Sequence, residues 1–144
     1  MLFVEKAIKL LKNNGVLGFI IPINFTTQPY ALKLREILLN QTKILKIIDL
    51  SNLYLFKNVS TNSSVLIVEK NKINKNHQIK SIRNDEHFLI NQDLFKIIDD
   101  YSFRLSLDRD NFNIIKKINE KSLKIGDICH VASGSRSITN PNFI

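Results

Sequence analysis

The chain has 144 residues, one cysteine and a formal net charge of +8, from 21 Lys and Arg against 13 Asp and Glu. This length suits one compact domain with a core and is too short for two full ones. The single cysteine, Cys129, excludes an internal disulfide and fits a reducing compartment. The three scattered histidines do not indicate a zinc site, and no apolar run is long enough to span a membrane. We therefore expect a cytoplasmic protein without a metal site.

The excess of basic residues favours an acidic partner, and nucleic acid is the commonest such partner because phosphate neutralisation supplies much of its affinity. Lys, Asn and Ile are abundant together, as in proteins encoded by AT-rich genomes. The base composition of the gene is therefore a second explanation of the charge, and the charge alone does not decide between the two.

The first two elements form half of a strand–helix–strand unit. Apolar residues at helical spacing over 3–11 predict an amphipathic helix, and Asn13-Asn14-Gly15 is a good end signal. Residues 16–21 follow as a continuous apolar run, which is typical of a strand buried on both faces of a parallel sheet.

Two further strands are expected. A second helix starts at Thr27-Gln28-Pro29 and ends at Asn40, with Tyr30, Leu34, Ile37 and Leu38 on its inner face. A strand at 44–50 and a strand at 64–69 follow. About a dozen residues without a helical pattern join these two strands, so we expect them to pair antiparallel.

The second half of the chain is less regular. Residues 70–83 are basic without an acidic residue, and we interpret them as a solvated hairpin in which 78–82 is a short edge strand. A phosphate contact is the less favoured interpretation. Helices are expected at 92–98 and 109–119, the latter with Asp108 as its N-cap. Residues 125–135 resemble the first strand and turn of a new unit.

Several catalytic motifs are absent from the sequence. The four glycines form neither a P-loop nor a G-x-G-x-x-G cofactor loop. A nuclease site of Asp49 with Glu69-Lys70 is not supported, because adjacent residues of a strand point to opposite faces. Asn140-Pro141-Asn142-Phe143 lacks the second proline of the Asn-Pro-Pro-Tyr motif. We expect no catalytic residue in this chain.

Five segments in order resemble the later motifs of gamma-group N6-adenine DNA methyltransferases of type II restriction–modification systems, including those fused to a nuclease. The segments are Phe3-Val4-Glu5-Lys6-Ala7 to Gly15, Val16 to Pro22, Leu34-Arg35-Glu36-Ile37-Leu38, Ile44 to Asp49, and Phe56 to Ile67. The resemblance is strong over residues 2–70 and looser beyond. There, Ile125-Gly126-Asp127-Ile128 is similar to the entry into the family's target recognition domain.

The resemblance implies an α/β fold, namely part of the Rossmann-like fold of S-adenosylmethionine-dependent methyltransferases. This part would contain the last three strands of a mixed sheet with flanking helices, followed by the start of a recognition domain. Residues 1–100 would be the C-terminal part of the catalytic domain, 101–124 a helical linker, and 125–144 a truncated target recognition domain.

The activity implied for the complete enzyme is the transfer of a methyl group from S-adenosylmethionine to the exocyclic amine of an adenine flipped out of double-stranded DNA. Phe3 matches the aromatic that contacts the cofactor's adenine, although its periodicity alone favours packing against the sheet. Phe56 matches the aromatic that stacks on the flipped base. A phenylalanine within a polar loop suits such a platform.

Five further residues are candidates for the base pocket or for DNA contact. Pro22 and Asn24 lie at the carboxyl end of the first strand, where open α/β sheets bind ligands. Lys57, Ser60 and Thr61 flank Phe56 in the polar loop.

The sequence departs from the family pattern in one respect. In the family, the cofactor loop and the Asn-Pro-Pro-Tyr motif precede the first helix, and neither is present here. We therefore expect a fragment, or the downstream half of an interrupted gene, that does not methylate DNA alone. The alternatives are a non-catalytic nucleic-acid-binding protein and a subunit that completes a split methyltransferase in trans. In either case the free edge of strand 16–21 is a predicted association site.

Overall fold

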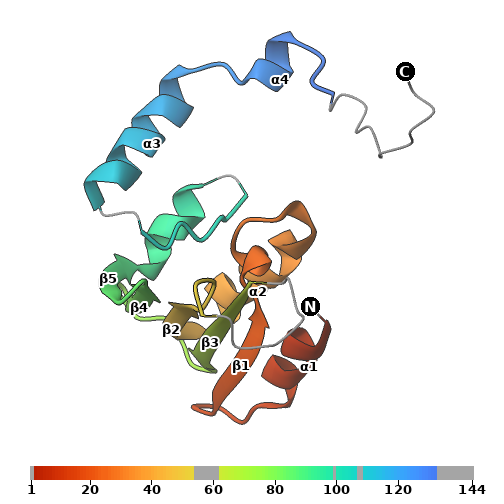
Figure 1. Ribbon diagram of the computed structural model, residues 1–144, viewed down its shortest axis with the longest axis vertical. Coiled ribbons are helices and arrows are strands. Elements are labelled where there is room, and N and C mark those ends of the chain that lie inside the picture. The colour runs from red at the N-terminus through yellow and green to blue at the C-terminus, as the bar shows by residue number, and fades with distance from the viewer. Residues whose placement is uncertain (1, 54–61, 99, 107–108, 133–144) are drawn as a thin grey trace, which may run out of the picture.

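The computed structural model describes residues 2–53, 62–98, 100–106 and 109–132. Figure 1 shows a sheet with α1 and α2 on one side, while α3 and α4 extend away from it. The elements are α1 (Leu2–Leu10), β1 (Val16–Pro22), the 3-10 helices η1 (Ile23–Thr26) and η2 (Pro29–Ala31), α2 (Leu32–Gln41), β2 (Lys43–Asp49), β3 (Ser63–Glu69), β4 (Gln78–Arg83), β5 (Glu86–Asn91), the 3-10 helix η3 (Gln92–Ile97), α3 (Arg109–Lys121) and α4 (Ile125–Ile128).

The sheet is mixed, with the strand order β1-β3-β2-β4-β5. β3 is antiparallel to both β1 and β2, which confirms the predicted pairing of the second and third strands. β2 is parallel to β4, and β4 is antiparallel to β5. The strands β1, β2 and β4 therefore run in one direction and end at the same edge of the sheet.

The sheet has five strands, where the sequence predicted three and a short edge strand at 78–82. The expectation that residues 78–82 form an edge strand is wrong, because β4 lies between β2 and β5. A two-residue turn joins β4 to β5, with positive φ angles of 50° at Asn84 and 62° at Asp85. Asn and Asp tolerate this conformation, which matches the twist of a tight hairpin. The hairpin therefore follows the basic segment 70–77 instead of containing it.

The expectation that β1 is buried on both faces is also wrong. β1 is an edge strand whose residues alternate between exposed and half-buried, and Val16 and Ile20 are 58% and 57% exposed. Leu17 and Phe19 pack on the core from the other face. An apolar run indicates burial of both faces, but in the described part of the chain no element covers the second face of β1.

The outer edge of β1 presents three backbone donors that pair with no strand among the described residues. Ile23 N donates to Asn62 O at 3.0 Å, and Lys70 N donates to Gly15 O at 2.9 Å. By the alternation of an antiparallel ladder, the odd-numbered residues of β1 therefore bond to β3. The N–H groups of Val16, Gly18 and Ile20 point to the free edge, and Pro22 has none to offer.

The core lies between the sheet and the helices, and it contains only part of each predicted inner face. In α1, Val4 and Ile8 are buried, whereas Phe3 and Leu10 are 83% and 72% exposed. In the second helical region Tyr30 is 64% exposed. The buried residues of α2 are Leu34, Arg35, Leu38 and Leu39.

Aromatic rings attach the C-terminal segment to this core. The ring of Phe103 lies with its centroid 4.9 Å from Phe95 and 6.0 Å from Phe25. Phe112, at the start of α3, lies 5.6 Å from Phe95. Ile115 is half-buried and Ile118 is 55% exposed, so the predicted apolar face of this helix packs only in its first half.

The end of the chain differs from its prediction. Residues 125–128 form the short helix α4 instead of the expected strand. The predicted N-cap Asp108 lies outside the described residues.

One charged side chain, Arg35, is completely buried in the core. Its Nη1 donates to Phe25 O at 2.9 Å and Gln28 O at 2.8 Å, and its Nη2 donates to Asp100 O at 2.8 Å. Burial lowers the pKa of Arg35, and the Asp100 charge partly offsets that effect. The guanidinium thus joins the turn after β1 to the segment that precedes Phe103.

Replacement of Arg35 by Met is expected to lower the free energy of unfolding by about 3–5 kcal/mol, because three main-chain carbonyls lose a charged donor. Urea unfolding followed by circular dichroism measures the effect. Lys33→Met is the matched control on α2, since Lys33 is exposed and pairs only with Glu36 at 2.9 Å. Equal unfolding midpoints for the two variants would contradict the assigned importance of Arg35.

A pH dependence is expected from Asp100. Burial raises the pKa of this carboxyl, but hydrogen bonds from Ser102 and the charge of Arg35 outweigh it and lower the pKa below its ordinary value. The stabilising contribution is therefore complete above the unfolded pKa of about 3.9 and is lost as the pH falls through the folded value. The difference in unfolding free energy between the unaltered chain and Asp100→Asn should shrink below about pH 4. A constant difference from pH 7 to pH 2 would refute this.

Candidate functional site at the carboxyl edge of the sheet

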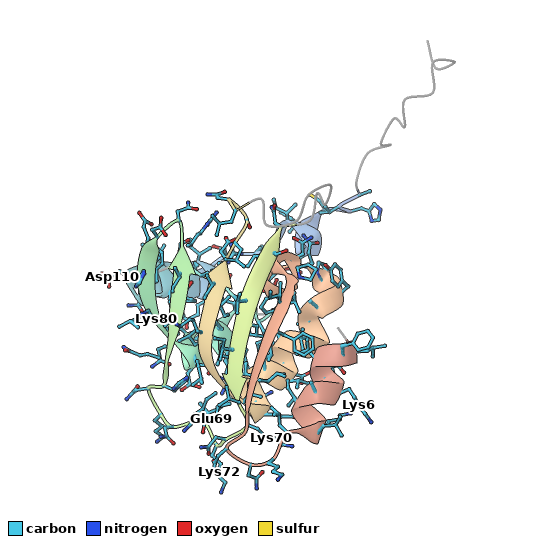
Figure 2. All side chains as sticks on the ribbon, turned by 60° about the horizontal axis from the view of Figure 1, so that its bottom comes forward. Lys6, Glu69, Lys70, Lys72, Lys80 and Asp110 are labelled. Carbon is cyan, nitrogen blue, oxygen red and sulfur yellow. The ribbon has the colours of Figure 1, made fainter. Side chains whose placement is uncertain are left out.

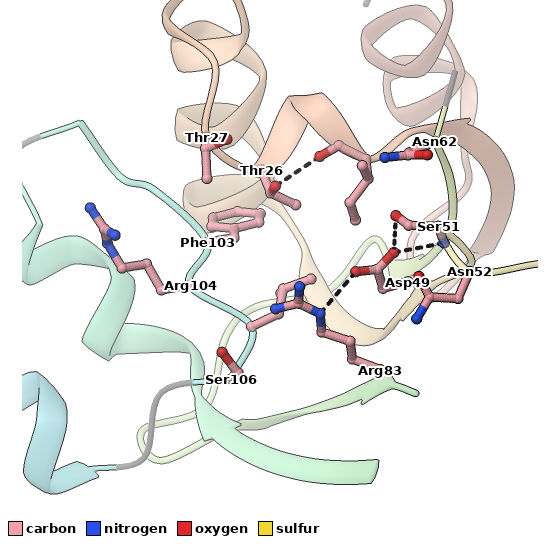
Figure 3. Close-up of a pocket in the computed structure, with 12 residues that line it drawn as sticks. Thr26, Thr27, Asp49, Ser51, Asn52, Asn62, Arg83, Phe103, Arg104 and Ser106 are labelled. Carbon is pink, nitrogen blue, oxygen red and sulfur yellow. Dashed lines mark hydrogen bonds and ion pairs between the residues drawn. The ribbon is translucent and has the colours of Figure 1, made fainter. Parts of the chain in front are cut away.

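A pocket of about 530 Å³ lies at the edge where β1, β2 and β4 end. Open α/β sheets bind ligands outside the carboxyl ends of their parallel strands. The residues that follow β1, those at the ends of β2 and β4, and the segment 103–106 line this pocket. Figure 3 shows how these four parts of the chain surround it.

An ion pair between the ends of β2 and β4 forms one side of the pocket. Arg83 Nε lies 3.4 Å from Asp49 Oδ2, and the two residues are register partners across the parallel strands. The Asp49 side chain is only 10% exposed, whereas that of Arg83 is 53% exposed. The other oxygen of Asp49 accepts hydrogen bonds from the backbone N–H and the hydroxyl of Ser51.

The opposite side is fixed by one side-chain and one main-chain hydrogen bond. Thr26 Oγ1 donates to Ile23 O at 2.7 Å, and Phe103 N donates to Thr26 O at 2.8 Å. Arg35 lies behind this wall and bonds to both of its segments. Hydrogen bonds of Thr26 and Phe103 therefore hold this wall beside the pocket, and those of Arg35 hold it from the core.

The connection between β2 and β3 begins and ends at the pocket. Ser51, Asn52 and Asn62 line it, and Leu50 N donates to Ser63 O at 2.9 Å. The predicted residues Phe56, Lys57, Ser60 and Thr61 belong to this connection and lie outside the described residues.

The three other predicted site residues are on the surface. Pro22 and Asn24 are exposed at the end of β1, and they flank Ile23, which lines the pocket. Phe3 is 83% exposed on α1, so it does not pack against the sheet, contrary to the expectation from its periodicity alone. α1 runs antiparallel to the neighbouring β1, so the first turn of α1 lies towards the edge of the sheet at which β1 ends (Figure 1).

Asp49, Arg83 and Phe103 were not predicted as site residues. Polar residues at the ends of strands are a signal that could have identified Asp49 and Arg83. No local signal places Phe103 there, because its position depends on contacts far apart in the sequence. The rejected nuclease grouping is excluded, since Glu69 pairs with Lys43 at the other end of β2 from Asp49.

The basic run of residues 70–83 does not form one patch. Lys70 Nζ donates to Lys9 O at 3.1 Å and to Leu11 O at 2.7 Å, and so caps the end of α1. Figure 2 shows Lys70 and Lys72 at one edge of the sheet and Lys80 on β4. Only Arg83 reaches the carboxyl edge.

The described part of the chain shows neither a metal-binding cluster nor a membrane-spanning helix. It holds no group of three or more His, Cys, Asp or Glu side chains suited to a metal ion. None of its helices has the length and apolar character needed to cross a membrane.

A family model and a solved structure resemble the chain. Residues 1–56 match the model of the Eco57I restriction-modification methylase family. A solved structure described as "Structural basis underlying complex assembly and conformational transition of the type I R-M system" covers 90% of this chain at 13% identity with a TM-score of 0.47, and this chain covers 26% of that one.

A curated relative matches almost the whole chain. The "Type II restriction enzyme and methyltransferase RM.Eco57I" of Escherichia coli is 29% identical over 153 residues, which are 99% of this chain and 15% of the relative. The chain thus spans a small part of that relative's length. The family match and this relative together confirm the resemblance to restriction–modification methyltransferases, and the chain corresponds to a part of such a protein.

Proposed function

We propose that the chain is the part of an adenine-specific DNA methyltransferase that forms one side of the target-base pocket. The observation that supports this most directly is the pocket itself. It lies at the ligand-binding edge of the sheet, and both ends of the segment that contains Phe56 border it. The polar lining suits a nucleotide, whose sugar and base edges need hydrogen-bonding partners.

The chain contributes binding surfaces and no reacting group. S-adenosylmethionine, when bound to the complete enzyme, supplies the methyl group that the exocyclic nitrogen of adenine receives. Phe56 would stack on the flipped base, and Pro22 and Asn24 would border it at the end of β1. Lys57, Ser60 and Thr61 would contact the DNA beside Phe56. The motif that orients the amino group is absent from the sequence.

Phe3 is the residue that we propose for cofactor contact. Its ring is 83% exposed, so a face is available for stacking on the cofactor's adenine. The fit of the chain to S-adenosylmethionine is limited to this contact, since the sequence has no G-x-G-x-x-G loop for the rest of the molecule.

The free edge of β1 suggests how the pocket is completed. Its three outward N–H groups need acceptors, and a further strand that carries the missing motif would supply them. The same edge supports a second candidate function, in which the chain completes a split methyltransferase in trans. In both cases residues 1–100 belong to the catalytic domain, 101–124 link it onward, and 125–144 begin a recognition domain.

Phe56→Ala tests the base-stacking assignment. The chain is co-expressed with the upstream half of a related enzyme that contains the cofactor loop and the Asn-Pro-Pro-Tyr motif, and transfer of labelled methyl groups to duplex DNA is measured. Loss of a base stack worth about 1–3 kcal/mol should slow methylation roughly 5- to 150-fold.

Two controls accompany this experiment. Phe56→Tyr retains the ring and should retain most of the activity, and the chain without its upstream half should transfer no methyl groups. If Phe56→Ala methylates DNA as fast as the unaltered chain, Phe56 does not stack on the target base.

A further inference from the structure

We infer that Arg83 is a DNA-phosphate contact, so that the pocket at the carboxyl edge binds the sugar–phosphate backbone beside the target base. This inference rests on the proposed function and assigns a ligand class to a residue that the sequence resemblance does not mark. It depends on the geometry of Arg83 and on the chemistry of the pocket lining.

Asp49 orients the guanidinium of Arg83 but contacts only one of its three nitrogens. Its Nε faces Asp49 at 3.4 Å, and its Nη1 and Nη2 have no hydrogen-bond acceptor among the residues that the structure describes. The side chain is 53% exposed, so a ligand can reach these two nitrogens from solvent. Figure 3 shows the side chain extending from β4 to Asp49 beside the pocket.

An arginine held in this way is suited to phosphate. The planar guanidinium binds two phosphate oxygens through parallel N–H donors, and prior orientation lowers the entropic cost of that contact. Asp49 offsets part of the charge of Arg83, but it faces only Nε and leaves the two other nitrogens of the guanidinium for a ligand. Arg104 also lines the pocket and is exposed, so two guanidinium groups oppose one carboxylate.

The remaining polar lining fits the same ligand. It consists of short hydroxyl and amide side chains that can donate to phosphate and sugar oxygens, and such side chains share these contacts with arginine in protein–DNA complexes. They are Thr26, Thr27, Ser51, Asn52, Asn62 and Ser106.

The other cations of the basic run are placed differently. Lys70 is occupied by the carbonyls at the end of α1. Lys75 lies before β4 and Arg83 is the last of that strand's six residues, so the strand alone separates them by about 17 Å at roughly 3.3 Å per residue. Lys75 therefore provides a matched control. It has the same charge as Arg83 and belongs to the same segment of sequence, but it lies at the opposite edge of the sheet.

The test is binding of a fluorescein-labelled DNA duplex to the full chain, followed by anisotropy between 20 and 200 mM NaCl, roughly the range over which phosphate contacts are most visible. Arg83→Gln should weaken binding about 10-fold at low salt and reduce the slope of log K against log salt by about 0.9. Lys75→Gln should change both quantities far less. Arg83→Lys should keep the slope and lose part of the affinity, because it keeps the charge without the planar fork.

Three results would overturn the inference. They are equal effects of Arg83→Gln and Lys75→Gln, no binding of DNA by the unaltered chain, and competition by polyglutamate as strong as by unlabelled DNA, which would indicate an acidic peptide instead. Matching thermal unfolding curves show that the variants are folded. If methylation is never reconstituted but Arg83→Gln still reduces the salt slope, the proposed function fails and the phosphate contact stands.

Discussion

The buried guanidinium of Arg35 connects the parts of the chain that build the pocket. A side chain with fewer hydrogen-bond donors cannot replace it, because it donates to carbonyls in the turn after β1 and in the segment before Phe103. The acceptors Gln28 and Asp100 are 72 residues apart in sequence (100 − 28), and a main-chain hydrogen bond from Phe103 N to Thr26 O also joins the two segments. Phe103 then fills the core between them, with its ring against Phe25 and Phe95. The pocket wall therefore depends on a charged residue that never reaches the pocket.

The direction of the strands explains where the pocket forms. β3 returns between β1 and β2, which leaves both of these strands ending at one edge, and the parallel entry of β4 adds a third end. Asp49 and Arg83 meet there only because they are register partners in adjacent parallel strands. The same arrangement brings both ends of the β2–β3 connection to that edge. The directions of the strands thus bring the polar residues of the pocket together, although these residues lie far apart in the sequence.

Periodicity is sufficient to predict α1, α2, β2 and β3, and the short connection without a helical pattern predicts that β2 and β3 are antiparallel. Periodicity fails where tertiary contacts determine the burial or the position of a residue. Arg35 follows Leu34 in a helical pattern that indicates a polar outer face, yet it is buried because carbonyls from distant segments surround it. The position of β4 beside β2 has no local signal, so the place of Arg83 at the end of a strand could suggest a site residue but not its pairing with Asp49. The apolar run of β1 predicted burial of both faces, and this is wrong because no element of the described part of the chain covers Val16 and Ile20.

The central claim is that the outer edge of β1 receives a strand that carries the catalytic motif. Hydrogen exchange of the β1 amides, measured with and without the co-expressed upstream half, tests it most directly. Leu17, Phe19 and Ile21 bond to β3 and should be protected in both samples. The account predicts that Val16, Gly18 and Ile20 exchange rapidly in the chain alone and become protected in the complex. A complex that methylates DNA while these three amides still exchange rapidly would contradict it.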